Sequence, residues 1–487
     1  MNNPAKKYQY AYSIAAAAII LLGIALRLKV LADSRCLWID EASVARNIYE
    51  RGFIGLTTPL DYYQYAPPLY LWIVKLSAIL FGYCEAALRL WPFIAGVGSL
   101  YFLWRILKRE TSAAVALYPL SLMATGFMYV RYGTELKQYI PDMFIATLLV
   151  YLALVVDVLK AQRGRFFFIW LVAGSLSIWA SMPSVFILAG IGLYYLVQVS
   201  KDVRKAGIVV VIAVLWILQF ALYYFIILKP QIHSGYLQNY HQNFFLFALP
   251  GSLAEWGHNK DVLLSILKVA VGDKWYTIYF NLILLAVGVV SLLRNHRAKS
   301  VLFILPLVCM IAAAAMNQYS LIPRLTLVIM PLLYVSMAYG FVRLLSNKTL
   351  RFLAVSIAIL CVFGYQRLDL FTQPFEQEEI TRGLDYLNKK GVAGNDLYVV
   401  VGAEHAYLYY TEMHPDKDKW HAIRHAHLLS GGIDYDSLAT NIQGKPAFLY
   451  TIVFDSFEGK KKLDNHIQLT DSFATEGCYV FIYCKPD

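Results

Sequence analysis

The sequence predicts a polytopic α-helical membrane protein with a small α/β domain at its C-terminal end. Hydrophobic residues make up 59% of the 487 residues and charged residues only 15%, whereas ordinary soluble domains carry about 25% charged residues. Apolar runs of membrane-spanning length recur along the first three quarters of the chain. Beyond residue 365 the pattern changes to short β-like runs.

The positive charges fall mainly in short loops between the apolar runs. The formal net charge is +11, a value that nucleic-acid-binding proteins also reach. No basic stripe with interleaved aromatic residues is present in the sequence, and such a stripe is what nucleic-acid binding requires. The placement of Lys and Arg instead follows the rule that cytoplasmic loops of membrane proteins are positive.

The first apolar run indicates a retained membrane helix rather than a cleaved signal peptide. Lys6 and Lys7 precede the run 10–31, which is too long for a signal h-region and lacks a small-x-small cleavage site. We therefore expect a cytoplasmic N-terminus.

Basic clusters and run lengths together predict eleven membrane spans. The run 67–82 has only about 15 residues, with Lys75 in its middle, so we expect a helix lying in the membrane interface. Counting it as a span would move most basic clusters to the other side. The expected outer loops are 32–88 and 229–274. The expected spans are 10–31, 90–107, 113–130, a run ending near 158, 166–183, 184–199, 206–228, 275–293, 301–316, 325–345 and a run ending near 365.

Residues 366–487 are predicted to form an extracytoplasmic α/β domain, and residues 1–365 the transmembrane module. The runs 397–401 and 478–483 are rich in Val, Ile and aromatic residues, which favours strands. The segment 376–390 is predicted to be an amphipathic helix.

Two adjacent carboxylates, Asp40 and Glu41, follow the first span directly. Trp38 and Ile39 precede them. A carboxylate next to apolar side chains of this kind can serve as a general base or hold a metal. The alternative is that Asp40 caps the helical stretch 42–49, and spacing alone favours this helix cap.

Two further polar segments are expected on the same outer face. The segment 131–142 contains Glu135, Lys137 and Tyr139, which alternate and would point together on an extended backbone; a solvated corner is the alternative. The segment 317–324 ends in Arg324, whose guanidinium presents paired N–H donors that suit phosphate. The alternative is an Arg side chain that extends to the membrane interface without a ligand, which is common.

The ordered motifs resemble the GT-C superfamily of polyprenyl-phosphate-sugar glycosyltransferases, in particular bacterial relatives of the dolichyl-phosphate-mannose protein mannosyltransferases. The resemblance spans roughly residues 10–345. The residues that carry it are Arg27, Trp38 to Ala42, Pro67 to Tyr70, Phe81-Gly82, Arg89-Leu90, Tyr129 to Tyr139, and Arg324 with Pro331.

The resemblance implies that a sugar is transferred, usually with inversion, from polyprenyl phosphate to a lipid, glycan or protein acceptor. The expected setting is the outer face of a bacterial inner membrane, with undecaprenyl phosphate as carrier. Asp40 would be the general base, with Glu41 supporting it and Glu135 as a further catalytic carboxylate at the second acidic position. Substrate binding would fall to Lys137, Tyr139, Arg324, Tyr65 and Arg89.

Two departures from the family pattern bear on a metal. Tyr65 and Ala66 stand where many relatives have His or a Glu-Lys pair that helps to hold a metal and the donor phosphate. A divalent ion is therefore left as an open cofactor, with Asp40 and His241 as its candidate ligands and His233 as a second outer histidine. Lys137 replaces the commoner Arg, which keeps the charge but loses the fork.

The sequence disfavours two other functions. A lipid or solute transporter would place ionisable groups near the membrane midplane, often in inverted repeats, but the apolar runs are nearly free of charge. A binding scaffold would leave the three polar outer segments without a role.

Overall fold

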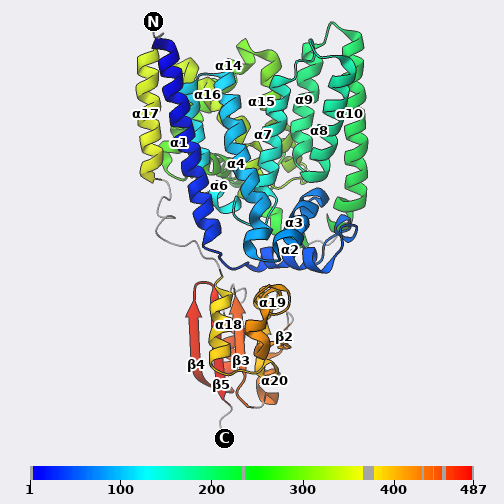
Figure 1. Cartoon of the computed structure of the whole chain (residues 1–487), viewed down its shortest axis with the longest axis vertical. Coiled ribbons are helices and arrows are strands. Elements are labelled where there is room, and N and C mark those ends of the chain that lie inside the picture. Colours follow the sequence, from blue (N-terminus) through cyan, green and yellow to red (C-terminus); the bar gives the residue numbers. More distant parts are fainter. Residues whose placement is uncertain are drawn as a thin grey trace.

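The computed structural model describes residues 4–232, 236–365, 378–429, 433–442, 444–451 and 457–484. A bundle of long helices occupies one part of the molecule, and a domain containing a β-sheet sits at one end of it (Figure 1). We call that end the domain end. The expected boundary at residue 366 and the start of the amphipathic helix at 376 lie outside the described residues.

Helices occupy the regions in which eleven spans were expected, and the number of helices that cross a membrane stays a prediction. Six described helices are long and apolar enough to cross a membrane, and several shorter apolar helices accompany them. The protein is a multi-pass membrane protein. The helices are α1 (Pro4–Ala32), α4 (Glu85–Glu110), α5 (Ala113–Thr125), α6 (Phe127–Tyr132), α7 (Tyr139–Val155), α8 (Arg163–Ala180), α9 (Ser184–Gln198), α10 (Val203–Tyr223), α14 (Trp275–Asn295), α15 (Arg297–Ala315), α16 (Met330–Leu344) and α17 (Lys348–Tyr365).

Short helices occupy the connections of the bundle. Both α2 and α3 lie at the domain end (Figure 1), and α3 has 14 residues, as expected for a helix too short to span. The large loop 229–274 is itself helical over much of its length. These elements are α2 (Ile39–Glu50), η1 (Gly55–Thr57), α3 (Pro68–Phe81), η2 (Tyr224–Leu228), α11 (Lys229–Ile232), α12 (Tyr236–His241), η3 (Gln242–Phe244), α13 (Leu253–Val271) and η4 (Pro323–Ile329).

One expected span is broken. Residues 113–130 form two helices that meet at Gly126, whose extended ψ of 131° ends α5. The break leaves carbonyl groups at the end of α5 without helical partners. The guanidinium of Arg27 donates to two of them, Ala124 O at 2.9 Å and Met123 O at 3.1 Å. Arg27 thus stabilises a bent backbone inside the bundle.

The C-terminal domain holds a five-stranded mixed sheet in the order β2-β1-β3-β5-β4. β1 pairs parallel with β2 and β3, whereas β5 runs antiparallel to β3 and β4. Its elements are α18 (Ile380–Lys389), η6 (Gly394–Asp396), β1 (Leu397–Val400), α19 (Val401–Leu408), η7 (Tyr409–Met413), η8 (Lys417–Ile423), β2 (His427–Leu429), α20 (Tyr435–Asn441), β3 (Ala447–Thr451), α21 (Glu458–Asp464), β4 (Gln468–Thr475) and β5 (Cys478–Cys484).

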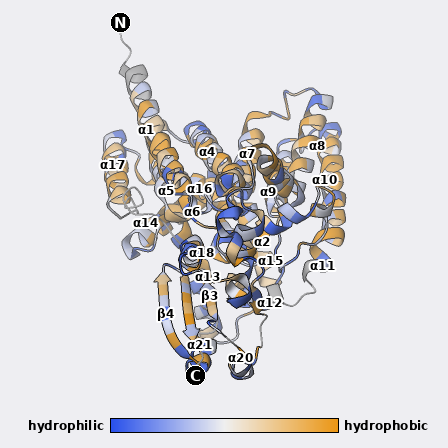
Figure 2. Ribbon diagram, turned by 60° about the horizontal axis from the view of Figure 1, so that its bottom comes forward, coloured by the Kyte–Doolittle hydropathy of each residue, from blue (hydrophilic) through white to orange (hydrophobic). Residues whose placement is uncertain are grey.

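The two faces of this sheet have separate cores. Val399, Leu449 and Val480 pack with α18 and α19, and the same apolar cluster continues into α2 and α3. Phe448 and Tyr450, one register position away, pack with α20 and α21 on the other face. In Figure 2 the helices α1, α8 and α10 are mostly hydrophobic, whereas hydrophilic residues gather on α2 and α20. The domain is therefore joined to α2 through a shared core.

Helices α14 and α16 approach so closely that a single methyl group would not fit between them. A Cβ at Gly288 would lie 1.8 Å from the carbonyl oxygen of Ser336. In α9, a Cβ at Gly192 would meet nothing within 4 Å. Small residues of this kind allow membrane helices to pack backbone to backbone.

Replacing these two glycines by alanine should therefore have opposite effects. Gly288→Ala should destabilise the protein by about 1–3 kcal/mol, because backbone atoms must move apart. Gly192→Ala should leave stability unchanged or raise it slightly, since alanine favours helix. Thermal unfolding in detergent micelles measures both, and equal melting temperatures for the two variants would contradict the close contact.

Candidate functional site

Asp40 lies in the first turn of α2, at the domain end of the bundle. The helix begins at Ile39, and its N-cap residue is Trp38, whose side chain makes no capping hydrogen bond. The expectation that Asp40 itself caps the helix is therefore wrong. A carboxylate inside the first turn is instead stabilised by the helix dipole, and it remains able to contact other groups.

Lys137 and Gln64 hold the carboxylate of Asp40. Lys137 Nζ lies 3.5 Å from Asp40 Oδ2 and donates to Gln64 Oε1 at 2.7 Å. Gln64 Nε2 in turn donates to Asp40 Oδ1 at 3.4 Å. Two expected outer segments, 32–88 and 131–142, thus meet at one carboxylate.

Arg324 brings the third expected segment to the same place. Its guanidinium lies 5.7 Å from the ring centre of Tyr139 and 5.5 Å from that of Tyr240, and it donates to Tyr240 Oη at 3.2 Å. No carboxylate of the described residues lies within ion-pair distance of Arg324, and its Nε is buried with no hydrogen-bond partner there. This cation is therefore available to an anionic ligand.

Neighbouring cations keep Asp40 ionised. Burial raises the pKa of Asp40, but the charges of Lys137 and Arg324 and the hydrogen bonds of Gln64 and Lys137 outweigh that effect, so the pKa lies below its ordinary value. Burial also lowers the pKa of Lys137, and the charge of Asp40 opposes that shift. An anion and two cations thus share a partly enclosed space.

Glu41 is directed away from this space and is completely buried. It forms a two-pronged ion pair with Arg89, with Oε1 2.8 Å from Nε and Oε2 2.7 Å from Nη2. Glu41 Oε1 also accepts from the backbone N of Leu136 at 2.6 Å. Arg89 donates further to the carbonyl oxygens of Arg35 and Cys36. The pair connects three segments behind Asp40.

Glu135 is likewise buried and paired with arginines. Its Oε2 lies 3.3 Å from Arg131 Nε and 4.0 Å from Arg35 Nη2. Burial and the charge of Glu41 raise the pKa of Glu135 above its ordinary value. Residues 135–138 form bends rather than the extended backbone that the alternation assumed, and Glu135 pairs with arginines whereas Lys137 pairs with Asp40. Their placement favours positioning roles for Glu41, Glu135 and Arg89.

Tyr65 and His241 lie at the border of the site. The Tyr65 hydroxyl is hydrogen-bonded to that of Tyr223, and its backbone oxygen accepts from Gln138 at 3.2 Å. His241 ends α12 beside Arg324, and burial together with the charge of Arg324 lowers its pKa to about 4. Tyr65 therefore touches the segment that carries Lys137 but not Asp40 itself.

The donor set around Asp40 does not fit a divalent ion. No group of three His, Cys, Asp or Glu residues suited to a metal occurs among the described residues. The charged neighbours of Asp40 are cations, and His241 stands next to Arg324. A divalent ion prefers several anionic or neutral donors, so we derive no step through a metal. His233 lies outside the described residues.

Known proteins with this architecture identify the fold. The crystal structure of ArnT from Cupriavidus metallidurans bound to undecaprenyl phosphate is similar with a TM-score of 0.57, 13% sequence identity and coverage of 97% of this chain and 98% of that one. The oligosaccharyltransferase of Archaeoglobus fulgidus, crystallised with zinc and sulfate, gives a TM-score of 0.52 at 13% identity over 97% of this chain and 73% of that one. The chain has the GT-C fold.

Sequence comparison agrees with this fold. Residues 65–225 match the dolichyl-phosphate-mannose-protein mannosyltransferase family. An uncharacterised protein of Aquifex aeolicus is 28% identical over 142 residues, which are 28% of this chain and 28% of that protein. The GT-C fold that the sequence motifs indicated is confirmed, and the family match covers residues 65–225 of the chain.

The C-terminal domain contacts the GT-C bundle next to Asp40, which the sequence motifs did not indicate. Tyr410 Oη accepts from the backbone N of Leu37 at 2.9 Å and donates to Glu85 Oε1 at 2.6 Å. His414 Nε2 lies 3.2 Å from the other oxygen of Glu85. On the far side of α2, Arg46 contacts His405 Nδ1 at 2.9 Å. The strand pattern of the sequence carried no signal for these contacts.

Glu378 contacts the residue that precedes Asp40. Its Oε2 accepts from the backbone N of Ile39 at 3.2 Å. Burial raises the pKa of Glu378 to about 9, although the hydrogen bond from Ile39 partly opposes this. The folded protein therefore holds Glu378 protonated at neutral pH, whereas an unfolded chain would ionise it.

This difference should make the stability of the protein depend on pH. Because the folded pKa of Glu378 is raised, its contribution is complete below the ordinary glutamate pKa and is lost as pH rises towards about 9. Glu378→Gln keeps a neutral side chain and should reduce the loss of thermal stability between about pH 5 and about pH 9. Melting temperatures in detergent across that range measure the effect.

Glu412→Gln, at an exposed position of the same domain, is the matched control and should melt with the pH dependence of the wild type. Identical pH profiles for the wild type and Glu378→Gln would contradict the buried, protonated state.

Proposed function

We propose that the protein transfers a sugar from a polyprenyl phosphate to a hydroxyl-bearing acceptor, with Asp40 as the general base. The observation that carries the proposal is the contrast among three carboxylates. The side chain of Asp40 is 28% exposed, whereas those of Glu41 and Glu135 are 0% exposed. Asp40 is thus the carboxylate of this cluster that a substrate can reach, and two cations flank it.

The reaction would use each of these groups in a distinct way. The acceptor hydroxyl gives its proton to Asp40 as its oxygen bonds to the anomeric carbon of the sugar. The bond from that carbon to the phosphate oxygen breaks, and polyprenyl phosphate leaves with the electron pair. Lys137 and Arg324 stabilise the charge on the phosphate, which needs no proton to leave. Tyr139 supports Arg324 through its ring face.

The setting of the reaction follows from the membrane topology. Polyprenyl phosphates lie in a membrane leaflet, and Asp40 lies at the end of the helical bundle (Figure 1). Lys108 and Arg109 lie in the last turn of α4, at the end away from the domain (Figure 1), and the positive-inside rule supports a cytoplasmic location for that end. The domain end then faces the outside of a bacterial inner membrane, with undecaprenyl phosphate as donor lipid. A lipid, glycan or protein would be the acceptor.

Asp40→Asn is expected to abolish sugar transfer while leaving the fold and the binding of the donor lipid intact. The amide has the shape of the carboxylate but cannot accept the proton, and loss of a general base lowers rates by about 10²–10⁴-fold. Transfer of radiolabelled sugar from a panel of polyprenyl-phosphate sugars in membranes measures this effect.

Glu50→Gln, at an exposed position of the same helix, provides the matched control and should retain turnover. Wild-type transfer by Asp40→Asn would remove Asp40 from the role of base.

Arg324→Ala should weaken binding of the donor lipid by about ten- to hundred-fold, because charge-assisted hydrogen bonds contribute about 1.5–3 kcal/mol. Arg324→Lys should fall between the alanine variant and the wild type, since it keeps the charge and loses the fork. Binding of polyprenyl phosphate in nanodiscs measures the affinities. Arg294→Ala, at the exposed end of α14, is the control; an unchanged affinity in Arg324→Ala would remove Arg324 from the phosphate site.

A further inference from the structure

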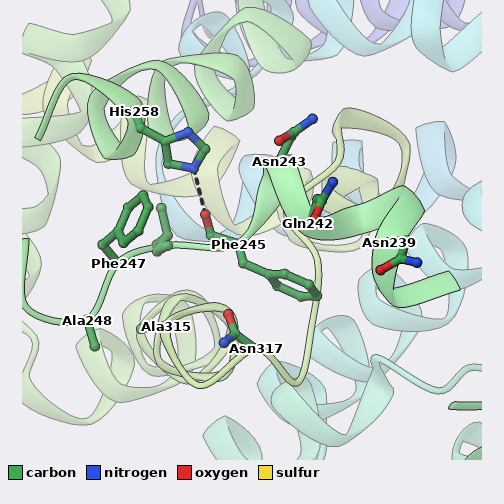
Figure 3. Close-up of a pocket in the computed structure, with 10 residues that line it drawn as sticks. Asn239, Gln242, Asn243, Phe245, Phe247, Ala248, His258, Ala315 and Asn317 are labelled. Carbon is green, nitrogen blue, oxygen red and sulfur yellow. Dashed lines mark hydrogen bonds between the residues drawn. The ribbon is translucent and has the colours of Figure 1, made fainter. Parts of the chain in front are cut away.

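A cavity of about 670 Å³ lies between the 239–248 segment, α13 and the end of α15. Figure 3 shows its lining, in which the ring of Phe245 stands between Asn239 on one side and Asn317 on the other. The lining residues are Asn239, Gln242, Asn243, Phe245, Leu246, Phe247, Ala248, His258, Ala315 and Asn317. Neither the proposed base nor the proposed phosphate ligands belong to this set.

The lining is partly polar and partly apolar, and it carries no acidic or permanently cationic side chain among the described residues. Four of its members, Asn239, Gln242, Asn243 and Asn317, are carboxamides, and each offers both donors and acceptors. Within the part of the chain that the structure describes, their side chains are not engaged with other protein groups. Such a surface suits an uncharged ligand with many hydroxyl groups, because each hydroxyl both donates and accepts.

Aromatic groups supply the apolar part of the lining. His258 Nε2 lies 2.8 Å from the backbone oxygen of Phe245, and its ring packs edge-on against Phe247 at 5.3 Å. These contacts fix the backbone of Phe245 and the ring of Phe247 around His258 (Figure 3). Ligand sites generally combine apolar walls with a few placed polar groups, and a sugar ring presents both an apolar C–H face and a hydroxyl edge.

The cavity is attached to the loop that carries Arg324. Leu321 N donates to Phe244 O at 3.0 Å, and Leu246 N donates to Ala314 O at 3.3 Å. Residues 244–246 are thus bound between α15 and the segment that leads to Arg324. Leu321 is three residues from Arg324, at most about 11 Å along an extended chain. Arg324 also donates to Tyr240, the neighbour of the lining residue Asn239, so the cavity lies beside the proposed phosphate ligand.

The segment that follows the cavity presents apolar side chains to the surroundings. Leu249, Leu253 and Trp256 are 93%, 92% and 61% exposed. Exposed leucine and tryptophan at the end of a membrane bundle are typical of contact with the lipid interface. A ligand held at the membrane surface is therefore favoured over a free soluble sugar.

We propose that this cavity binds the uncharged hexose or pentose ring of a lipid-linked saccharide. The inference rests on the proposed function and assigns it a sugar subsite. The ring belongs either to the polyprenyl-phosphate donor or to a glycolipid acceptor, because both present the same hydroxyl and C–H chemistry at the membrane surface.

The test compares the wild type with Asn239→Ala/Gln242→Ala, two exposed positions, in nanodiscs. The probes are polyprenyl phosphate, polyprenyl-phosphate glucose, a glucosyl diacylglycerol and diacylglycerol itself. The double variant should bind at least one glucose-bearing probe about ten-fold more weakly, the loss expected for two hydrogen bonds. Its affinity for bare polyprenyl phosphate and its melting temperature should not change. Asn295→Ala, an exposed amide at the end of α14, should bind every probe as the wild type does.

The outcomes separate the two proposals. A loss confined to polyprenyl-phosphate glucose assigns the cavity to the donor sugar, and a loss confined to the glucosyl lipid assigns it to the acceptor. Unchanged binding of both glucose probes by the double variant overturns the sugar subsite, even where Arg324→Ala still weakens binding of bare polyprenyl phosphate. Failure of the wild type to bind bare polyprenyl phosphate would instead overturn the proposed function. In that case, weaker binding of the glucosyl diacylglycerol by the double variant, with unchanged binding of diacylglycerol, would still assign the cavity to a sugar.

Discussion

The buried ion pair between Glu41 and Arg89 is the interaction on which the geometry around Asp40 depends. Both side chains are almost completely enclosed, at 0% and 1% exposure. Removing one partner of such a pair typically costs about 3–5 kcal/mol, because the other charge is left buried without compensation. Here the pair also satisfies the carbonyl oxygens of Arg35 and Cys36 and the backbone N of Leu136. It therefore fixes α4, the start of α2 and the 134–138 turn relative to one another.

That constraint explains how two neighbouring carboxylates acquire different tasks. Consecutive residues of a helix point about 100° apart, so anchoring Glu41 inward turns Asp40 towards Lys137 and the open side of the site. Holding Lys137 near Asp40 also depends on the pair, because the Leu136 amide binds Glu41. The fold thus uses Glu41 to orient Asp40.

Much of this arrangement could be predicted from the sequence. The features that could not be predicted depend on contacts between residues far apart in the chain. Hydropathy and loop charge predict helices facing lipid, and the motifs around Asp40, Lys137 and Arg324 predict a shared site, because each follows from local composition. The break at Gly126 is stabilised by Arg27, which lies 99 positions earlier in the chain and donates hydrogen bonds to the free carbonyl groups at the end of α5. Tyr410 and Glu378 contact α2 through a fold-level docking of two modules, and no short-range pattern encodes that docking.

The charged groups around Asp40 carry an excess of positive charge. Five cations stand against three carboxylates in one coupled cluster: Arg35, Arg89, Arg131, Lys137 and Arg324 against Asp40, Glu41 and Glu135. Glu41 and Glu135 offset two of the three inner arginines, and Asp40 alone opposes Lys137 and Arg324, so one positive charge is left in excess on each side. The excess beside the part-exposed Asp40 is the one that a ligand can reach. Burying uncompensated charge is costly, and an anion bound there would offset that cost while its charge shields Asp40 from both cations. A departing phosphate would leave the cations to hold Asp40 ionised again, so the same excess charge that favours binding a lipid phosphate also restores the base for the next turnover.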